Sequence, residues 1–498
     1  MIKKPLKKNC VSLAAACLLP LLAHAAEVNL PDMGSPADAI LSKTDEAQIG
    51  RAIMHSIRGS GQLVEDPLIA EYVNEIGHRV AAYANDGDHK FTFFVIDDPV
   101  INAFALPGGF IGIHTGLLEA TRSEDELAGV LAHEIAHVTQ RHIARAVHAN
   151  QRQSLLSTAI MLGAIVAGAA GAGSDVVQGG IAVAQGSQAQ AQINFTRSNE
   201  YEADRIGISA LADAGFDPQG MASFFEVISR SSGSGEFKVP EFLRTHPVSS
   251  DRIAESRGRA REYPPVRTTD SKNYGIARAR LLVAKQNTAE DAVSFFERQN
   301  YEFMTDAQRY GLAVAYTRNG DHQKANRIFE ELVNREPEVI AYHIGLAQSQ
   351  LAQEQIDAAV RTFEKARELF PRNTPLIVHY AEALLQLGRP QYAHEMLLDL
   401  LNNTPPTPDQ VRLIARAADE AGESAEAYYY MAEYRFMIGD LLGGVSFLQR
   451  ALSVPELNEI QRIRFESRID FIREFMTEEQ LQQLQRSRSV TQSASLLP

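Results

Sequence analysis

The C-terminal half of the chain repeats every 34 residues, and this period limits the fold more than any other feature. Five columns of similar residues recur at that spacing. They are Ala325, Ala359 and Ala393; Phe329, Phe363 and Leu397; Leu312, Leu346 and Tyr380; Ala313, Ala347 and Ala381; and Pro337, Pro371 and Pro405. A repeat of this length holds two helices, which cannot bury their apolar faces alone and therefore stack on their neighbours. The sequence thus predicts an all-α solenoid.

The period is that of tetratricopeptide repeats. The same template fits again, shifted, at Met431, Ala432, Gly439, Leu448 and Ala451, and more weakly around Ala292 and Phe296. The stretch 408–424 departs from it, which predicts either one odd helix or a bend. We predict a repeat domain over 270–485 and a disordered tail over 486–498. Solenoids present a concave surface to a peptide or protein; the alternative is that the repeats only stabilise the rest of the chain.

The first half of the chain is expected to fold as a separate unit, because 498 residues are too many for one core. A polar stretch with two prolines, 262–272, is a plausible linker between the two units. We therefore predict a mainly α protein whose first domain spans 26–265.

The pentapeptide His133-Glu134-Ile135-Ala136-His137 points to a metal site in this first domain. Two histidines four residues apart leave the same side of a helix one turn apart and can bind one ion. Glu134 lies beside the pair, where its carboxylate could act as a base on the hydrolytic water. By itself the pattern is equally compatible with an amphipathic helix that carries two histidines by chance.

A catalytic zinc ion generally takes three protein ligands, so two histidines are not enough. Glu200 and Asp204 lie four residues apart in a segment with helical spacing. One of these carboxylates could bind the metal while the other accepts the N–H of a ligand histidine. A solvated acidic first turn is the alternative. Glu202 points away from Glu200, and we expect it at the surface.

Four motifs in order resemble the M48 family of zinc metallopeptidases. They are the run Asn102–Ile111, the His133–His137 pentapeptide, Glu200 with Asp204, and His246-Pro247 followed by Arg252. The resemblance implies a zincin-like α+β domain with a small sheet at its cleft. It also implies one zinc ion held by His133, His137 and Glu200, with Glu134 as general base and acid and Asp204 supporting a ligand histidine.

The resemblance suggests roles for further residues. His246 would either donate a hydrogen bond to the developing oxyanion or occupy the fourth zinc position as a latch, and we leave both alternatives open. The stretch from Phe104 to His114, with Gly109 and Phe110, would form a strand beside the cleft to which an extended substrate adds. Pro107-Gly108-Gly109 would turn the chain tightly, and an ordinary hairpin at the rim, with no role in substrate binding, is the alternative. Arg252 would hold either the substrate or the His246 segment.

Three other histidines are weaker candidates. His142 and His148 fall on the predicted helix of His137 but on another side of it, so we expect them at the surface. His114 follows the predicted strand and could line the cleft.

The N-terminus has the form of a secretory signal peptide over residues 1–25. Four lysines precede an apolar run, and Ala23-His24-Ala25 offers a cleavage site. Both cysteines, Cys10 and Cys17, lie in this segment, so the mature chain would have neither a disulfide nor a thiolate metal ligand. Cleavage would move the formal net charge from −14 to −18, which disfavours nucleic acid and anionic lipid as partners.

The segment 157–192 is apolar at first and then rich in glycine, alanine and glutamine. It is too interrupted for a membrane span. Packing against the domain is our first interpretation, a lid over the cleft the second, and peripheral contact with the outer membrane the third.

Together these patterns predict a periplasmic zinc endopeptidase. The resemblance implies that it degrades misfolded or stalled outer-membrane proteins, and that its repeats bind either the substrate or the β-barrel assembly machinery, with possible chaperone activity. The rival interpretation is a latent or non-proteolytic chaperone or scaffold for outer-membrane assembly. A purely structural zinc protein is a third alternative, disfavoured because a structural site needs no Glu134.

Overall fold

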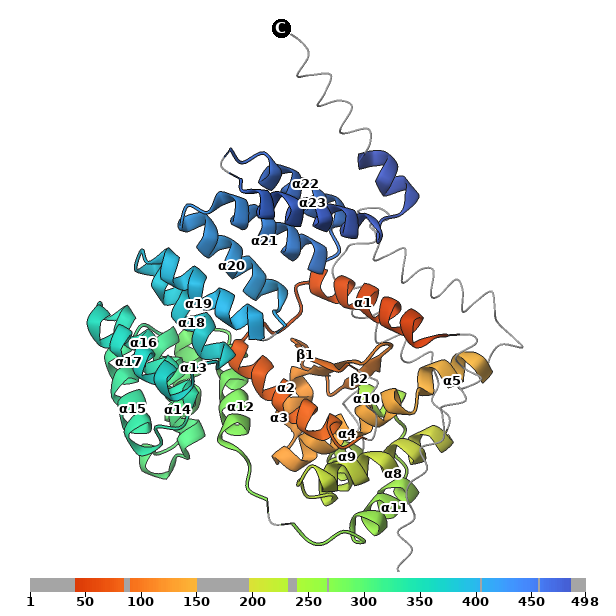
Figure 1. Ribbon diagram of the computed structural model, residues 1–498. Coiled ribbons are helices and arrows are strands. Elements are labelled where there is room, and N and C mark those ends of the chain that lie inside the picture. Colours follow the sequence, from red (N-terminus) through yellow and green to blue (C-terminus); the bar gives the residue numbers. More distant parts are fainter. Residues whose placement is uncertain are drawn as a thin grey trace, which may run out of the picture.

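The computed structural model describes residues 41–84, 90–149, 197–231, 240–266, 268–403, 405–455 and 457–484. Figure 1 shows a helical domain around a small sheet, followed by a curved array of helices, which confirms the predicted mainly α architecture. The predicted signal peptide, the segment 157–192 and the tail 486–498 lie outside the described residues. Within the described parts of the chain, no helix is long and apolar enough to cross a bilayer.

The first domain surrounds a three-stranded sheet with helices. Its elements are α1 (Lys43–Gly59), α2 (Pro67–Ala81), β1 (Thr92–Ile96), β2 (Ala103–Leu106), β3 (Phe110–His114), α3 (Thr115–Ala120), α4 (Glu124–Thr139), α5 (His142–Ala149), α8 (Arg197–Asp213), α9 (Gln219–Ser231), α10 (Glu241–Thr245) and α11 (Ser250–Ala260).

The strand order is β1-β3-β2, with β1 parallel and β2 antiparallel to the central strand β3. The stretch from Phe104 to His114 is therefore a hairpin, with the tight turn that Pro107-Gly108-Gly109 predicted. Its turn contains Gly108 and Gly109 with φ of 80° and 86°, a conformation that residues with a side chain rarely adopt. Because β3 is paired on both sides, β2 is the hairpin strand with an open edge, and α4 packs against β2.

Alternating side chains of the sheet serve two different cores. Ala105, Ile111 and Ile113 face the core that contains α4, whereas Phe94 and Phe104 face α1. This division follows from the period of two along a strand. The sheet is thus covered on both faces, and this packing fixes the position of the β2 edge relative to α4.

Helix α4 is the buried centre of the domain. The side chain of its N-cap residue, Ser123, accepts a hydrogen bond from the backbone N–H of Glu126 at 3.3 Å. Helices α8 and α9 approach α4 at two glycines: a Cβ on Gly129 would lie 2.7 Å from the backbone nitrogen of Met221, and one on Gly207 would lie 3.0 Å from the backbone of Ala132. These close approaches bring residues of α8 within reach of the α4 histidines.

Helix α4 ends at Thr139, earlier than the sequence suggested. Arg141 has φ of 51°, and a new helix, α5, begins at His142. The guanidinium of Arg141 is buried and donates hydrogen bonds to the carboxylate of Glu46 and the carbonyl of Leu41. The expectation that His142 continues the helix of His137 is therefore wrong, and its cause is this tertiary anchoring, since no glycine or proline marks the break.

The second domain is all helical. Its elements are α12 (Lys272–Ala284), α13 (Ala289–Glu297), η2 (Tyr301–Phe303), α14 (Asp306–Arg318), α15 (His322–Arg335), α16 (Ile340–Ala352), α17 (Ile356–Leu369), α18 (Thr374–Gln386), α19 (Pro390–Asn403), α20 (Pro408–Glu420), α21 (Ser424–Met437), α22 (Leu441–Leu452) and α23 (Glu459–Arg473).

The 34-residue period is visible in the backbone. Gly320, Glu354, Gly388 and Gly422 each follow the previous one by 34 residues, and all have positive φ in the loop between two paired helices. The stretch 408–424, whose side chains depart from the repeat, therefore keeps its backbone geometry: α20 and α21 form another pair. The period breaks afterwards, at Gly439, which joins α21 to α22.

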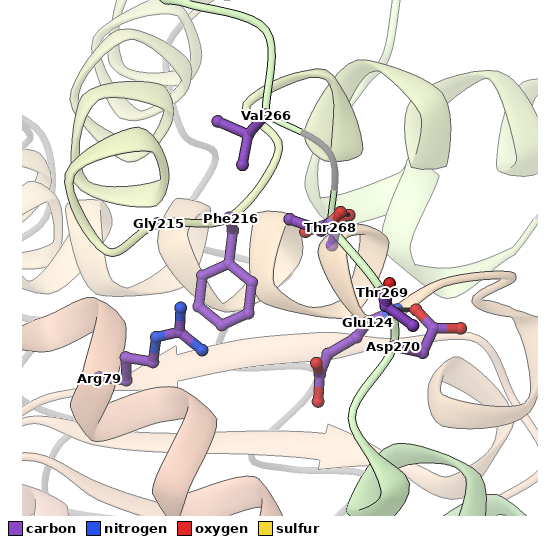
Figure 2. A pocket seen from close by; sticks show the side chains of 9 residues that line it. Arg79, Glu124, Gly215, Phe216, Val266, Thr268, Thr269 and Asp270 are labelled. Atoms are coloured by element: carbon purple, nitrogen blue, oxygen red, sulfur yellow. Dashed lines mark hydrogen bonds between the residues drawn. The ribbon is translucent and has the colours of Figure 1, made fainter.

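The two domains share α12. Tyr274, Ala277 and Leu281 belong to the core of the first domain, whereas Ile276 and Ala279 belong to the core of the repeats. The linker before α12 also lies against the first domain, because the N–H of Glu124 donates to Asp270 and the N–H of Ser271 donates to Glu124. A cavity of about 260 Å³ lies beneath this linker, and Figure 2 shows side chains that line it, among them Arg79, Phe216 and Asp270.

Candidate metal centre and catalytic site

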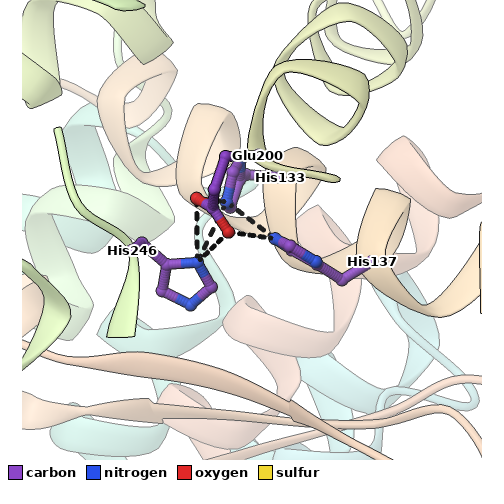
Figure 3. Close-up of side chains that lie close together, drawn as sticks. All are labelled: His133, His137, Glu200 and His246. Carbon is purple, nitrogen blue, oxygen red and sulfur yellow. Dashed lines mark hydrogen bonds and ion pairs between the residues drawn. The ribbon is translucent and has the colours of Figure 1, made fainter. Parts of the chain in front are cut away.

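Four buried side chains from three parts of the chain converge in the first domain. His133 and His137 come from α4, Glu200 from α8, and His246 from the residue after α10. One nitrogen or oxygen atom of each lies within 4.8 Å of the others. Figure 3 shows the three imidazoles and the carboxylate facing a common point.

The distances in this cluster fit a single tetrahedral ion. Nε2 of His133 lies 3.0 Å from Nε2 of His137 and 3.3 Å from Nδ1 of His246. Nδ1 of His246 lies 3.3 Å from Glu200, whose oxygens are 3.5 Å from each α4 histidine. Tetrahedral ligands about 2.1 Å from an ion lie about 3.4 Å apart. Nitrogen and carboxylate donors at this spacing suit zinc.

Glu134 lies beside the cluster in an enclosed position. Its side chain is fully buried. Oε1 lies 3.5 Å from Nε2 of His246. Burial raises the pKa of the Glu134 carboxyl, although the nearby histidines His246 and His133 oppose this. A carboxyl whose pKa is perturbed by burial beside a cluster of metal-binding groups is typical of a catalytic group.

Asp204 and Arg252 hold the cluster from behind. Oδ1 of Asp204 lies 2.9 Å from Nδ1 of His133. Arg252 donates to both oxygens of Asp204 at 2.7 and 2.8 Å and to Glu200 at 2.8 Å. It also donates to the carbonyl of Pro247 at 2.8 Å, and its side chain is 2% exposed. Of the two roles expected for Arg252, the geometry therefore favours holding the His246 segment over contact with the substrate.

The charges of this network shift several pKa values. Burial by itself would lower the pKa of His133, but the carboxylates of Asp204 and Glu200 outweigh it and raise the pKa to about 9. Burial and the neighbouring His133 hold the pKa of His137 well below its usual range. Burial would raise the pKa of Glu200, yet the surrounding histidines hold it well below normal. Glu200 is thus an anion ready to bind a cation.

His246 is held in place by the segment on which it lies. Its backbone N–H donates to the carbonyl of Phe242 at 2.7 Å, and the two rings lie 4.9 Å apart between centroids. The ring of Phe242 is fully buried. These contacts, together with the bond from Arg252 to Pro247, orient the imidazole toward the α4 histidines.

Three of the residues expected to contact substrate, Phe104, Gly109 and Phe110, lie outside the metal cluster. Phe104 is buried against Phe94 and His114 on the α1 face of the sheet. Phe110 also belongs to the α1 side, and Gly109 lies in the hairpin turn. None of these side chains joins the cluster. In the described part of the sheet, the edge of β2 away from β3 is unpaired.

Comparison with known proteins identifies both domains. Residues 67–260 match the family model Peptidase family M48, and residues 306–338 and 350–417 match two models described as Tetratricopeptide repeat. Over 485 residues the chain is 34% identical to the Beta-barrel assembly-enhancing protease of Escherichia coli strain K12, covering 95% of this chain and 97% of that one. The protein of the same name in Yersinia pestis is 33% identical over 450 residues, with coverage of 89% and 91%.

The chain belongs to peptidase family M48.

A further relative matches a shorter part of the chain. The Mitochondrial metalloendopeptidase OMA1 of Schizosaccharomyces pombe is 33% identical over 183 residues, which cover 36% of this chain and 50% of that one. The family and the names of its members confirm the prediction that this M48 protein is a metalloendopeptidase. Family membership also implies a metal, and the cluster of His133, His137, Glu200 and His246 provides donors for it.

Sequence reasoning missed one residue of this M48 site. His142 was expected at the surface, but it is fully buried and its Nδ1 lies 2.8 Å from Nδ1 of His137. Burial lowers the pKa of His142 to about 4. Glu202 was expected at the surface and is a quarter exposed, yet it lies 3.3 Å from Nε2 of His142. No sequence signal marks this contact, because it depends on the break between α4 and α5.

Two other candidate histidines, His148 and His114, lie outside the cluster. His148 is exposed on α5, as expected. His114 does not reach the cluster; it is buried at the end of β3, 3.8 Å from Asp98.

Proposed function

We propose that this chain is a periplasmic zinc endopeptidase that acts on outer-membrane β-barrel proteins during their assembly. The observation that carries the catalytic part is the four-donor cluster with the fully buried carboxyl of Glu134 beside it. The apparent signal peptide supports the compartment, and the names of the relatives support the substrate class.

His133, His137 and Glu200 would hold the zinc ion, and Asp204 would orient His133 by accepting its Nδ1–H. A bound zinc ion supplies a Lewis acid that polarises the scissile carbonyl and makes water more acidic. At neutral pH Glu200 is anionic and His137 is neutral, and these are the states in which a carboxylate and an imidazole bind a metal ion. His133, whose pKa is about 9, would release a proton when the metal binds.

Glu134 would move the proton. Its carboxylate accepts a proton from the attacking water as the new C–O bond forms, and then delivers that proton to the departing amide nitrogen as the C–N bond breaks. A raised pKa favours this double role, since the group must both take and give a proton near neutral pH.

His246 would control access to the metal. Its Nδ1 lies at the same distance from His133 and Glu200, 3.3 Å, as expected of a fourth ligand. This geometry favours the latch over the oxyanion donor, because a ligand in the fourth position excludes water and substrate. Opening the latch would require the Pro247 segment to move away from Arg252.

The repeats would bind the substrate protein or the β-barrel assembly machinery. They span more than ten helices, and stacked helix pairs offer an extended surface to a protein partner. A latent protein that acts mainly as a chaperone is a second candidate, and the position of His246 is the observation in its favour.

Two substitutions test this proposal with an unfolded outer-membrane β-barrel protein as substrate. Glu134→Gln should retain one zinc per chain and lose hydrolysis, because only the proton acceptor is removed. His246→Ala should raise the rate of cleavage if His246 is a latch. His148→Ala is the matched control, since this histidine is exposed on α5.

The results separate the candidates. Wild-type cleavage by Glu134→Gln would refute the catalytic assignment. Loss of cleavage in His246→Ala with zinc retained would replace the latch by the oxyanion donor. If neither the wild-type protein nor any variant cleaves the substrate, but all of them prevent its aggregation, the results favour the hypothesis of a non-proteolytic chaperone.

A further inference from the structure

We propose that His142 is a positioning residue that orients the imidazole of His137 for metal binding, and that Glu202 and Arg145 complete this support. The inference deepens the proposed function, because it requires His137 to be a metal ligand. It assigns a purpose to a polar network that leads from the buried His142 to the surface and that hydrolysis itself does not use.

The network forms a chain of contacts leading outward from the metal centre. Nε2 of His137 faces His133 at 3.0 Å, so its other nitrogen, Nδ1, points away from the cluster. That nitrogen lies 2.8 Å from Nδ1 of His142. Nε2 of His142 lies 3.3 Å from Glu202, and Nη1 of Arg145 donates to the same carboxylate oxygen at 2.9 Å.

Protonation follows from these contacts. A histidine that binds a metal through Nε2 carries its proton on Nδ1, so His137 must donate there. Nδ1 of His142 is then the acceptor, and the proton of His142 lies on Nε2, directed at the anionic Glu202. The direction of every hydrogen bond in the chain is thereby fixed, and a fixed tautomer keeps Nε2 of His137 free to bind the ion.

The two α4 histidines are supported differently. His133 has the carboxylate of Asp204 directly at its Nδ1, 2.9 Å away. His137 has a neutral imidazole between itself and a carboxylate, and Glu202 is a quarter exposed whereas Asp204 is buried. The proton of His137 is therefore held less strongly, which makes His137 the more weakly anchored of the two ligands.

Packing alone is the alternative explanation for a fully buried His142. The two explanations make opposite predictions for two substitutions. His142→Phe keeps the ring volume but removes the acceptor, whereas His142→Asn keeps an acceptor near the position of Nδ1 and loses volume. Positioning predicts that Asn retains metal affinity better than Phe. Packing predicts that Phe is the milder change.

The experiment measures zinc affinity by competition with a chromophoric chelator at pH 7.5, on full-length chains that have wild-type circular dichroism. We expect His142→Phe to weaken zinc binding by about 10- to 100-fold. His142→Asn should recover most of the affinity, and Glu202→Gln should show a smaller loss. The visible spectrum of the cobalt-substituted protein should change in the Phe variant and resemble wild type in the Asn variant. His148→Phe on the same helix should bind zinc as wild type does.

Wild-type affinity in His142→Phe would overturn the inference, as would an Asn variant as weak as Phe. The parallel measurement of His137→Ala distinguishes this failure from that of the proposed function. If His137→Ala loses zinc affinity while His142→Phe keeps it, only the role of His142 is wrong. If His137→Ala also keeps it, the ligand set itself is wrong.

Discussion

Replacing Arg252 by methionine should loosen the helices that carry the acidic side of the metal centre. The guanidinium is buried and donates three hydrogen bonds of 2.7 to 2.8 Å to Asp204 and Glu200. It also lies 4.9 Å from the ring centroid of Phe225, a cation–π contact. Methionine has a similar length but no charge, so the variant would leave two buried carboxylates without their shared cation.

The expected cost is about 3 to 5 kcal/mol, as for other buried ion pairs that lose one partner. Since about 1.4 kcal/mol corresponds to a factor of ten, local opening of α8 and α11 should become about 100- to 3,000-fold more frequent. Hydrogen–deuterium exchange of the metal-free full-length chain measures this opening as lost protection of peptides from these helices. Peptides from α16, in the repeat domain, serve as the internal reference.

A matched variant separates burial from charge. Arg259→Met removes an arginine from the same helix, α11, but one whose partner Glu255 lies 3.7 Å away at the surface. Its cost should stay below about 1 kcal/mol. Arg252→Lys should fall between, because lysine keeps the charge but cannot donate to both oxygens of Asp204 at once. Protection of α8 in Arg252→Met within threefold of wild type would refute the reasoning.

Two further predictions concern other parts of the fold. Burial lowers the pKa of His55, which packs against Gly439, to about 4. The unfolded chain therefore binds a proton on this histidine near pH 6.5, whereas the folded chain does not. The free energy of unfolding should consequently fall as the pH drops from 6.5 toward 4, by at most about 3 kcal/mol. The urea midpoint should fall more for wild type than for His55→Gln between pH 7.5 and 5, and equal changes would contradict the prediction. Gly129→Ala should cost about 1 to 3 kcal/mol, because its Cβ would lie 2.7 Å from the backbone of Met221. Gly258→Ala, with no atom within 4 Å of the new Cβ, should instead stabilise the fold by about 0.5 to 1 kcal/mol. Thermal unfolding measures both effects, and an unfolding temperature of Gly129→Ala that equals or exceeds that of Gly258→Ala would show that the helices adjust freely.

Local patterns predicted what depends on local geometry. The helix that carries His133 and His137 follows from spacing along one element, and so does the proximity of the two imidazoles. The solenoid follows from a repeat whose members bury equivalent residues, such as Ala325 and Ala359. Even here the side-chain pattern predicted too short a regular array, because the 34-residue period of the backbone continues to Gly422 through a stretch with atypical residues.

Predictions failed where a contact joins separate elements. The alternating pattern of residues in the hairpin is symmetric, so it could not say that Phe104 faces α1 while Ala105 faces the core of α4. The end of α4 at Thr139 depends on Arg141 reaching Glu46 in α1, 95 residues earlier. His142 consequently looked like a surface residue.

The sequence by itself determined which groups are available for chemistry in this protein: the pair His133 and His137, the neighbouring carboxyl of Glu134, and a stack of helix pairs in the second domain. These features are periodic, and periodicity is readable one element at a time. Only the tertiary structure decided that His246 completes the cluster, that Arg252 is buried beneath it and that His142 supports His137. Each of these contacts depends on the exact distance between elements that are far apart in sequence but packed together in space. No local sequence pattern encodes such a distance.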